Sequence, residues 1–409
     1  MAIITSIALS ALMLAGCTPK FTPKADEAGW YAIWGAAMYD ASADETPFNP
    51  ALKENTVRQQ IRVSMGGDKL KLTFSNLKGD IPLNIESVHI ALMPNGGADS
   101  TIDTATDTVV TFGGQESVTI EAGKTATSDE IPFSFEALDD IAVTMKLGKY
   151  VGGNITVHRG ARCHTWVAEG NHVTDEVMPD GKTMTSWYYL TEVSTYAEAG
   201  TKTVVCLGDS ITDGANTTVN SFSRWSDALA RYLVEDGYQV GIVNKGIGGN
   251  AIFGGLGQAA KDRFDRDVLE VEGVRACIVM IGINDIGSAK EDISDKLIAE
   301  YKVMIEKCHA NGIAIYGATL TPIKNNGYYS ELHEQIRVTL NEFIRSENSG
   351  FDGYIDCDKA MEDPNNPGTM RPEDVKGWND FLHPGDDGYA IMGKTAHEEI
   401  TAIWANNAK

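Results

Sequence analysis

The sequence predicts an α/β protein in which an antiparallel β-sandwich precedes a parallel sheet covered by helices on both faces. The chain has 409 residues, a length that suggests two or three domains. Before residue 198, short alternating apolar runs are separated by glycine, asparagine and aspartate turns, which is typical of antiparallel sandwiches. After residue 200, apolar runs of strand length alternate with amphipathic runs of helix length, which indicates a parallel sheet.

The β-sandwich is expected to span residues 25–198 as an accessory domain. One segment within it, residues 27–39, has the length of a helix, and Trp30 and Trp34 would pack on one face of that helix because they lie four residues apart. The clearest alternating runs, which predict strands, are residues 56–65, 70–74, 118–120 and 142–147.

The domain with the parallel sheet is expected to span residues 200–409. The change of hydrophobic period places the boundary near residue 200. The predicted strands are residues 203–207, 239–244, 276–281, 313–320 and 353–356, and the predicted helices are residues 224–235, 258–269, 294–311, 329–346 and 387–405.

The N-terminal residues are expected to be a targeting segment. An apolar run over residues 3–14 is too short to span a bilayer and leads into Leu14-Ala15-Gly16-Cys17. Although no positive charge precedes the run, this resembles a bacterial lipoprotein signal with its lipobox at residues 1–17. The resemblance implies lipidation of Cys17 and a location in the bacterial cell envelope, lipid-anchored or secreted, with membrane contact only through that anchor.

Charge and cysteine content exclude other classes. The net charge of −23 argues against nucleic-acid binding, because phosphate recognition needs basic patches. Five cysteines follow Cys17, and an odd number excludes a fully paired disulfide framework. No metal site is predicted, since the spacing of one histidine and cysteine cluster fits no familiar ligand set. That cluster is His158, Cys163, His164 and His172.

A candidate nucleophile stands where the first predicted parallel strand ends. The strand runs into Gly208-Asp209-Ser210, which places the serine at the carboxyl edge of the sheet, where ligands gather in α/β folds. The surroundings differ from the Gly-x-Ser-x-Gly elbow of many hydrolases. A serine hydroxyl becomes a good nucleophile only with a base, which works best when an acid orients it.

The candidate base and acid precede the last predicted helix. Asp380 and His383 are three residues apart, so one turn can place the carboxylate against Nδ1–H of the imidazole while Nε2 faces the serine. The alternative is structural, since Asp380 or Asp386 would also suit the cap of that helix.

Two further strand ends offer hydrogen-bond donors for an oxyanion. The glycine-rich residues 244–250 would let a backbone N–H approach a substrate, and Ala251 stands where a dinucleotide fingerprint needs its third glycine. Asn284 follows the third strand and could donate its side-chain amide into the same pocket. Its alternative is an asparagine turn at a strand end.

These four segments, in this order, resemble the SGNH (or GDSL) hydrolases, which have a flavodoxin-like parallel sheet. The resemblance covers about residues 203–400. It implies that Ser210 is the nucleophile, with Asp380 and His383 completing a catalytic triad. It also implies an oxyanion hole formed by Ser210, Gly249 and Asn284, with Gly248 as the near alternative to Gly249.

The resemblance implies a serine-esterase mechanism without metal or cofactor. Ser210 attacks an ester carbonyl, His383 moves the proton to the leaving alcohol, and water hydrolyses the acyl-enzyme. The N-terminal half extends the likeness to a two-domain secreted branch that is xylan-esterase-like. The residues that carry this extension include Arg58, Arg62, Ser64, Gly66, Gly67, Leu72, Phe74, Arg224, Trp225 and Ile286.

The implied function is hydrolysis of short acyl esters, above all acetyl esters, on a polysaccharide or oligosaccharide. Two alternatives stay open: a lipase or thioesterase for longer acyl chains, and a catalytically silent glycan-binding lipoprotein. All triad and oxyanion positions are filled, which opposes the silent protein.

Several side chains have two interpretations. Asp213 would shape the pocket or cap its own turn, and we favour the cap. Arg224 would reach a substrate, or pair with Asp227 or another acid on its helix, and the sequence does not separate the two. Aromatic residues of the first half would bind glycan or, as we favour, pack in the core. These aromatic residues are Trp30, Trp34, Trp166, Trp187, Tyr188 and Tyr189.

Overall fold

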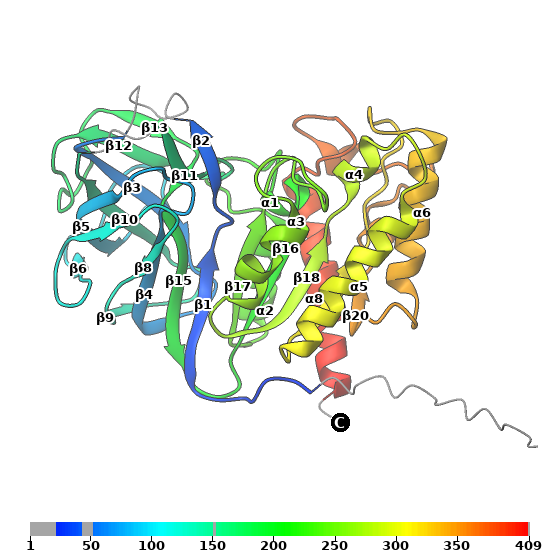
Figure 1. The fold of residues 1–409 in the computed structure, drawn as a ribbon, viewed down its shortest axis with the longest axis horizontal. Coiled ribbons are helices and arrows are strands. Elements are labelled where there is room, and N and C mark those ends of the chain that lie inside the picture. The colour runs from blue at the N-terminus through cyan, green and yellow to red at the C-terminus, as the bar shows by residue number, and fades with distance from the viewer. Residues whose placement is uncertain (1–21, 43–51, 150–152, 408–409) are drawn as a thin grey trace, which may run out of the picture.

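The computed structural model describes residues 22–42, 52–149 and 153–407. A β-rich part built from the N-terminal half lies beside an α/β part built from the C-terminal half (Figure 1). Strand β15 ends at Ala197 and strand β16 begins at Lys202. The change from antiparallel to parallel pairing therefore falls between these two strands.

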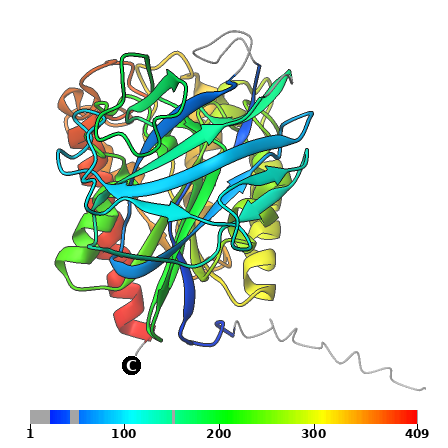
Figure 2. The same ribbon diagram turned by 90° about the vertical axis from the view of Figure 1, so that its left-hand side faces the viewer.

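The β-rich part consists of antiparallel sheets, as the alternating sequence predicts. One sheet has the order β1-β15-β4-β8, another has the order β13-β12-β3-β10-β5-β6, and β14-β11-β2 form a small third sheet. Figure 2 shows these strands in front of the helices of the other part. The strands are β1(Gly29–Gly35), β2(Tyr39–Ser42), β3(Asn55–Arg62), β4(Gly67–Ser75), β5(Leu83–Leu92), β6(Thr108–Val110), β7(Val118–Ile120), β8(Thr125–Thr127), β9(Ile131–Phe135), β10(Asp140–Leu147), β11(Asn154–His158), β12(Thr165–Glu169), β13(Lys182–Met184), β14(Trp187–Tyr188) and β15(Leu190–Ala197).

The two large sheets share one apolar core. Leu72 of β4 and Val193 of β15 meet Val57 of β3 and Val143 of β10 in the same buried cluster. Alternation usually marks a strand with one solvated face, but β3 is buried on both faces. Its Arg58 has no exposed surface and donates to the Ser100 carbonyl oxygen at 2.7 Å. Loops thus cover the polar face of this sheet.

The expected helix over residues 27–39 is wrong, because this segment forms strand β1. The strand pairs with β15 along its length, with a bulge between Ala32 and Trp34. The Trp30 ring stands edge-on to Tyr196. A strand buried against neighbours on both faces reads as a continuous apolar run, which explains why the pattern resembled a helix.

The α/β part has the predicted architecture. Its five strands are parallel and have the order β17-β16-β18-β19-β20, which is the flavodoxin-like order. The expected fold class is thereby confirmed. The strands are β16(Lys202–Gly208), β17(Val240–Gly246), β18(Val274–Met280), β19(Ala314–Ala318) and β20(Gly353–Ile355). The helices are α1(Ser210–Asp213), α2(Trp225–Glu235), α3(Ala260–Phe264), a π-helical turn (Asp265–Leu269), α4(Ile283–Gly287), α5(Ser294–Ala310), α6(Glu331–Arg345), α7(Cys357–Met361), a 3₁₀ turn (Pro372–Val375) and α8(Asp386–Asn407).

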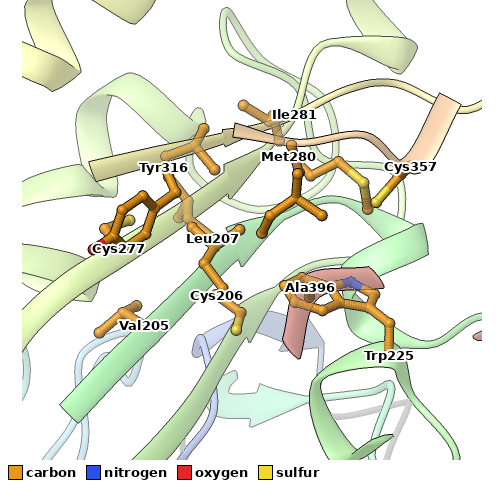
Figure 3. Packing of buried hydrophobic residues seen from close by; sticks show 14 of the residues in the cluster. Val205, Cys206, Leu207, Trp225, Cys277, Met280, Ile281, Tyr316, Cys357 and Ala396 are labelled. Atoms are coloured by element: carbon orange, nitrogen blue, oxygen red, sulfur yellow. The ribbon is translucent and has the colours of Figure 1, made fainter. Parts of the chain in front are cut away.

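The core of the α/β part lies on both faces of this sheet. Figure 3 shows Cys206 of β16 on the side of the sheet where Trp225 of α2 and Ala396 of α8 lie. The five cysteines in the described residues are free and buried. Cys206 and Cys277 therefore act as small apolar residues, as their strand positions suggest.

The two parts are packed against each other through strand β1, which lies beside β17. The backbone N–H of Ile242 donates to Ser64 Oγ at 2.7 Å, and Thr203 Oγ1 donates to the Ala32 carbonyl oxygen at 2.9 Å. A Cβ atom on Gly241 would lie 2.1 Å from that same carbonyl oxygen. The interface therefore combines polar contacts with close backbone approach.

Two expectations concern the N-terminus and the membrane. Cys17 lies outside the described residues. Within residues 22–42, 52–149 and 153–407, no helix is long and apolar enough to cross a membrane.

Candidate active site

Ser210 stands at the junction of strand β16 and helix α1. The Asp209 side chain caps this short helix by accepting the Ile211 N–H at 3.0 Å. Gly208 must be small, because a Cβ atom there would lie 2.6 Å from the Met280 carbonyl oxygen of the neighbouring strand. This turn presents the Ser210 hydroxyl at the carboxyl edge of the sheet.

The structure brings Ser210, His383 and Asp380 into one hydrogen-bonded chain. Ser210 Oγ lies 2.8 Å from His383 Nε2, and His383 Nδ1 lies 2.6 Å from Asp380 Oδ2. Partial burial raises the pKa of the Asp380 carboxyl, but the hydrogen bonds from His383 outweigh it and hold the pKa below its usual range. The carboxylate stays ionised, and this chain can accept a proton from the serine.

The same turn fixes the aspartate in place. Asp380 Oδ1 accepts the backbone N–H groups of Leu382 at 3.0 Å and His383 at 2.9 Å. Asp380 therefore serves its own turn and the imidazole rather than capping α8. Asp386 is used elsewhere, since its Oδ1 accepts the Thr218 N–H at 3.0 Å.

Two asparagines that the sequence did not single out anchor this loop. Asn216 Nδ2 donates to the carbonyl oxygens of Lys376 at 2.9 Å and His383 at 3.1 Å. Asn326 Nδ2 donates to the Asp380 carbonyl oxygen at 2.7 Å. Neither residue belongs to a recognisable motif, so only the folded structure reveals them.

The glycine-rich turn after β17 separates the two candidate oxyanion glycines. The Gly248 N–H is occupied, because it donates to Asp213 Oδ2 at 3.1 Å. The Gly249 N–H takes part in no hydrogen bond within the described residues. Gly249 also has φ of +71°, a left-handed conformation that favours glycine. The free donor in this turn is therefore that of Gly249.

Asn284 is held by contacts to other segments rather than by a local turn. Its Nδ2 donates to the Asn250 carbonyl oxygen at 2.8 Å, and its Oδ1 accepts the Tyr328 hydroxyl at 3.0 Å. The next residue, Asp285, accepts the Ile252 N–H at 2.8 Å. These bonds fix the amide plane and leave the second N–H of Asn284 as a donor.

A buried arginine links the strand ends around the site. Arg263 has no exposed surface, and its guanidinium donates to the carbonyl oxygens of Gly208 at 3.1 Å and Lys245 at 2.8 Å. It also donates to Asn250 Oδ1 at 3.1 Å and pairs with Asp267 at 2.9 Å. The sequence signal is faint: an arginine and an aspartate four residues apart on a helix.

Asp209, next to the candidate nucleophile, occupies an unfavourable setting. Its carboxyl is buried, and Oδ2 has no hydrogen-bond partner among the described residues. Burial raises the pKa of Asp209 to about 7. The cap of α1 is thus formed at an electrostatic cost.

The favoured interpretation of Asp213 as a cap of its own turn is wrong. Its carboxylate accepts from His158 of the β-rich part and from the Gly248 N–H. Arg224 pairs with Asp227 at 3.4 Å, one of its two expected roles, and also donates to the Gly160 carbonyl oxygen at 3.1 Å. Arg224 is buried and tied to protein atoms, so it is not placed to meet a substrate.

The aromatic residues weighed as glycan contacts are mostly core. Trp34, Trp187, Tyr188 and Tyr189 are buried. Trp166 is partly buried against a small apolar cluster, and Trp30 lies against Tyr196 and Lys71.

The histidines and cysteine near residue 160 do not converge. His158 meets Asp213, Cys163 donates to the Gln60 carbonyl oxygen, His164 meets Asn220, and His172 meets Asp175. In the part of the chain that the structure describes, no three histidine, cysteine or acidic residues are grouped to hold a metal ion.

An exposed tryptophan that sequence reasoning missed stands beside the candidate base. Trp378 is 57% exposed, and its ring meets the His383 ring edge-on with centroids 5.1 Å apart. It lines a surface hollow of about 420 Å³ with Arg162 and Thr185 of the β-rich part. The other lining residues are Asn216, Thr217, Thr218, Val219 and Gly377. A lone tryptophan in an irregular loop has no periodic signal.

Part of the chain is similar to known proteins. Residues 206–391 match the model of the GDSL-like lipase/acylhydrolase family. No curated protein matches the chain. Similar solved structures include a GDSL-like lipase from Bacteroides thetaiotaomicron, with 21% identity and a TM-score of 0.38 over 50% of this chain and 89% of that chain. A lipase/acylhydrolase from Enterococcus faecalis has 21% identity and a TM-score of 0.40 over 49% and 96%. A variant of an acetyl xylan esterase from Geobacillus stearothermophilus has 22% identity and a TM-score of 0.38 over 49% and 94%.

Proposed function

We propose that the protein is a serine esterase, and the match of residues 206–391 to the GDSL-like lipase/acylhydrolase family model supports this. The observation that carries the proposal is the unbroken chain from Ser210 Oγ through His383 to Asp380, with distances of 2.8 and 2.6 Å. A nucleophile, a base and an orienting acid in this order are what acyl transfer to serine requires.

In the proposed mechanism, Ser210 Oγ attacks the ester carbonyl carbon as His383 Nε2 takes its proton. Asp380 holds the imidazole and stabilises its charged form. The tetrahedral intermediate collapses, and His383 returns the proton to the departing alcohol. Water then attacks the acyl-enzyme with His383 again as base, releasing the carboxylic acid and restoring Ser210.

The oxyanion would be held by the backbone N–H groups of Ser210 and Gly249 and by the side-chain amide of Asn284. The N–H of Ser210 belongs to the first turn of α1, where helical donors have no intrahelical partner. The free N–H of Gly249 and the oriented amide of Asn284 support this assignment. Donors fixed in advance are worth most where charge develops in the transition state.

We propose short acyl groups, above all acetyl, on a polysaccharide or oligosaccharide as the substrate class. The likeness of the sequence to xylan-esterase-like enzymes supports this class. Trp378 supports it further, because an exposed indole beside the catalytic imidazole offers a flat apolar face to a sugar ring, and polar groups line the adjoining hollow.

The test is acetate release from a panel of acetylated glycans, with Ser210→Ala as control. Turnover by the parent protein and loss of at least about 10⁴-fold in the variant support the serine mechanism. A parallel series of nitrophenyl esters separates the substrate classes. A steep fall beyond short chains supports deacetylation, whereas a preference for long chains indicates a lipase or thioesterase. Glycan binding without any turnover indicates the silent binding protein.

We also propose that Cys17 carries a lipid that anchors the protein in the bacterial cell envelope. The lipobox-like residues that precede it support this proposal. The parent protein should partition into detergent and Cys17→Ser should remain in the aqueous phase. Equal partitioning of both would contradict the anchor.

A further inference from the structure

A buried histidine–aspartate contact joins the two parts of the chain beside the candidate oxyanion turn. His158 ends strand β11 of the β-rich part, and Asp213 ends helix α1, three residues after Ser210. His158 Nε2 lies 2.9 Å from Asp213 Oδ1, and both side chains are 3% exposed. The proposed mechanism uses neither residue.

The imidazole of His158 is held at both ring nitrogens. Its Nδ1 lies 2.9 Å from the Ala37 carbonyl oxygen, which only accepts hydrogen bonds. Its Nε2 lies 2.9 Å from Asp213 Oδ1, so both ring nitrogens face oxygen atoms. Trp187 stacks on the ring with centroids 5.5 Å apart, and Tyr39 meets it edge-on. Contacts within the β-rich part therefore fix where Nε2 of this ring lies.

Asp213 passes this constraint to the glycine-rich turn. Its Oδ2 accepts the Gly248 N–H at 3.1 Å and lies 3.4 Å from Arg162. Burial opposes the charged form, but the charges and hydrogen bonds of His158 and Arg162 outweigh it and hold the pKa of Asp213 below its usual range. The carboxylate is thus a permanent acceptor between the accessory part and the residue that precedes Gly249.

Two glycines allow the backbone to approach Asp213 closely. A Cβ atom on Gly160 would lie 2.3 Å from Asp213 Oδ2, and one on Gly246 would lie 2.3 Å from the Asp213 backbone nitrogen. Arg224 Nε also donates to the Asp213 carbonyl oxygen at 3.0 Å. Asp213 is therefore closely packed where the two parts of the chain meet.

We propose that His158 is a positioning residue. Through it the β-rich part holds the oxyanion turn, because His158 contacts Asp213 and Asp213 accepts the N–H of Gly248. This inference rests on the proposed esterase function. In the transition state the Gly249 N–H must lie where the oxyanion forms, and a small displacement of a donor weakens it sharply. The β-rich part is then a component of the catalytic unit rather than an appended module.

The kinetic test compares three variants of the full-length protein. His158→Leu removes both ring nitrogens, His158→Gln keeps an N–H group near the position of Nε2, and His89→Leu is the matched control. His89 lies in the same β-rich part, and its Nδ1 is 2.9 Å from Asp107. Rates on a nitrophenyl ester are divided by the active sites that a fluorophosphonate titrates on Ser210, so loss of folded protein does not count.

For His158→Leu we expect kcat to fall about tenfold or more with KM within about twofold. His158→Gln should recover a large part of that loss, and His89→Leu should match the parent. An unchanged kcat in His158→Leu, with the parent active and Ser210→Ala inactive, overturns this inference and leaves the proposed function intact. A loss of the same size in His89→Leu also overturns it, because the effect is then general.

A second measurement does not depend on activity. Hydrogen–deuterium exchange of the peptide over residues 246–256 should become faster in His158→Leu and stay at the parent rate in His89→Leu. Unchanged exchange in His158→Leu overturns the physical link. If the parent hydrolyses no ester at all, the proposed function fails and the claim of catalytic positioning falls with it, while the exchange result still decides whether His158 holds the turn.

Discussion

The two sides of the candidate active site are built in opposite ways. On the base side, Asp380 and His383 lie three positions apart, and one turn supplies all the hydrogen bonds between them. On the oxyanion side, the Asn284 amide depends on Tyr328, 44 positions away, and the turn at Gly248 depends on Asp213, 35 positions away. A pair of catalytic residues within one turn can be predicted from the sequence. The contacts that hold the oxyanion donors cannot, because they form between residues far apart in the chain.

The largest expected effect is on the base side. His383→Ala should lower kcat by about 10⁴-fold or more, because His383 Nε2 is the group placed to take the Ser210 proton. Steady-state hydrolysis of a nitrophenyl ester measures it. His397→Ala is the control, since this histidine lies on α8 and faces Asp236 at 2.9 Å. A residual rate within about tenfold of the parent in His383→Ala would refute the assignment of the base.

The oxyanion side should tolerate the loss of one donor better than the base side tolerates the loss of His383. Asn284→Ala should lower kcat by about 10²- to 10³-fold with little change in KM, because an oxyanion donor acts mainly in the transition state. The comparison with His383→Ala in one assay gives the ranking. A rise in KM at constant kcat would instead show that Asn284 binds the ground-state substrate.

Much of the parallel domain was predictable because its pattern is repetitive. The predicted strand at residues 203–207 is observed as Lys202–Gly208, and the predicted helix at 294–311 as Ser294–Ala310. Apolar strands buried on both faces and amphipathic helices each have a clear period. The prediction for strand β1 was wrong because burial of this strand on both faces removes the alternation that distinguishes a strand from a helix.

The site was predictable only where function is written in contiguous residues. Ser210 and His383 stand in short motifs, and the structure places their reactive atoms together. Arg263 and Tyr328 carry no such motif, because their roles arise from elements that meet only after folding. Asp213 was misjudged for the same reason, since its partner His158 lies 55 positions away in the other part.

Arg263 allows the contribution of the network behind the oxyanion side to be measured as a free energy of unfolding. Arg263→Met should destabilise the protein by about 3 kcal/mol, because buried carbonyl oxygens lose their donor and Asp267 loses one of its two arginine partners among the described residues. Urea unfolding gives the free energy of unfolding. Lys261→Met, on the exposed side of the same helix, is the control. Equal midpoints for the two variants would show that this network contributes no net stability.

The smallest expected effect concerns Asp209, which caps helix α1 at the nucleophile turn. Burial raises the pKa of Asp209 to about 7 in the folded state, whereas an unfolded aspartate titrates near 4. The folded state thus binds more protons, so this carboxyl costs no stability below about pH 4, costs more as the pH rises to about 7, and costs a constant amount above it.

Asp209→Asn keeps an oxygen for the Ile211 N–H and removes the charge. The stability of the variant relative to the parent should therefore increase by about 2 kcal/mol between pH 5 and pH 8. Asp292→Asn is the control, because hydrogen bonds from Ser294 lower the pKa of Asp292, so this carboxyl is ionised at both pH values and its substitution should show no such change. The contrary result is a difference in urea midpoint between Asp209→Asn and the parent that is the same at both pH values. It would show that the pKa of Asp209 is not raised in the folded state and that the nucleophile turn imposes no electrostatic cost on the fold.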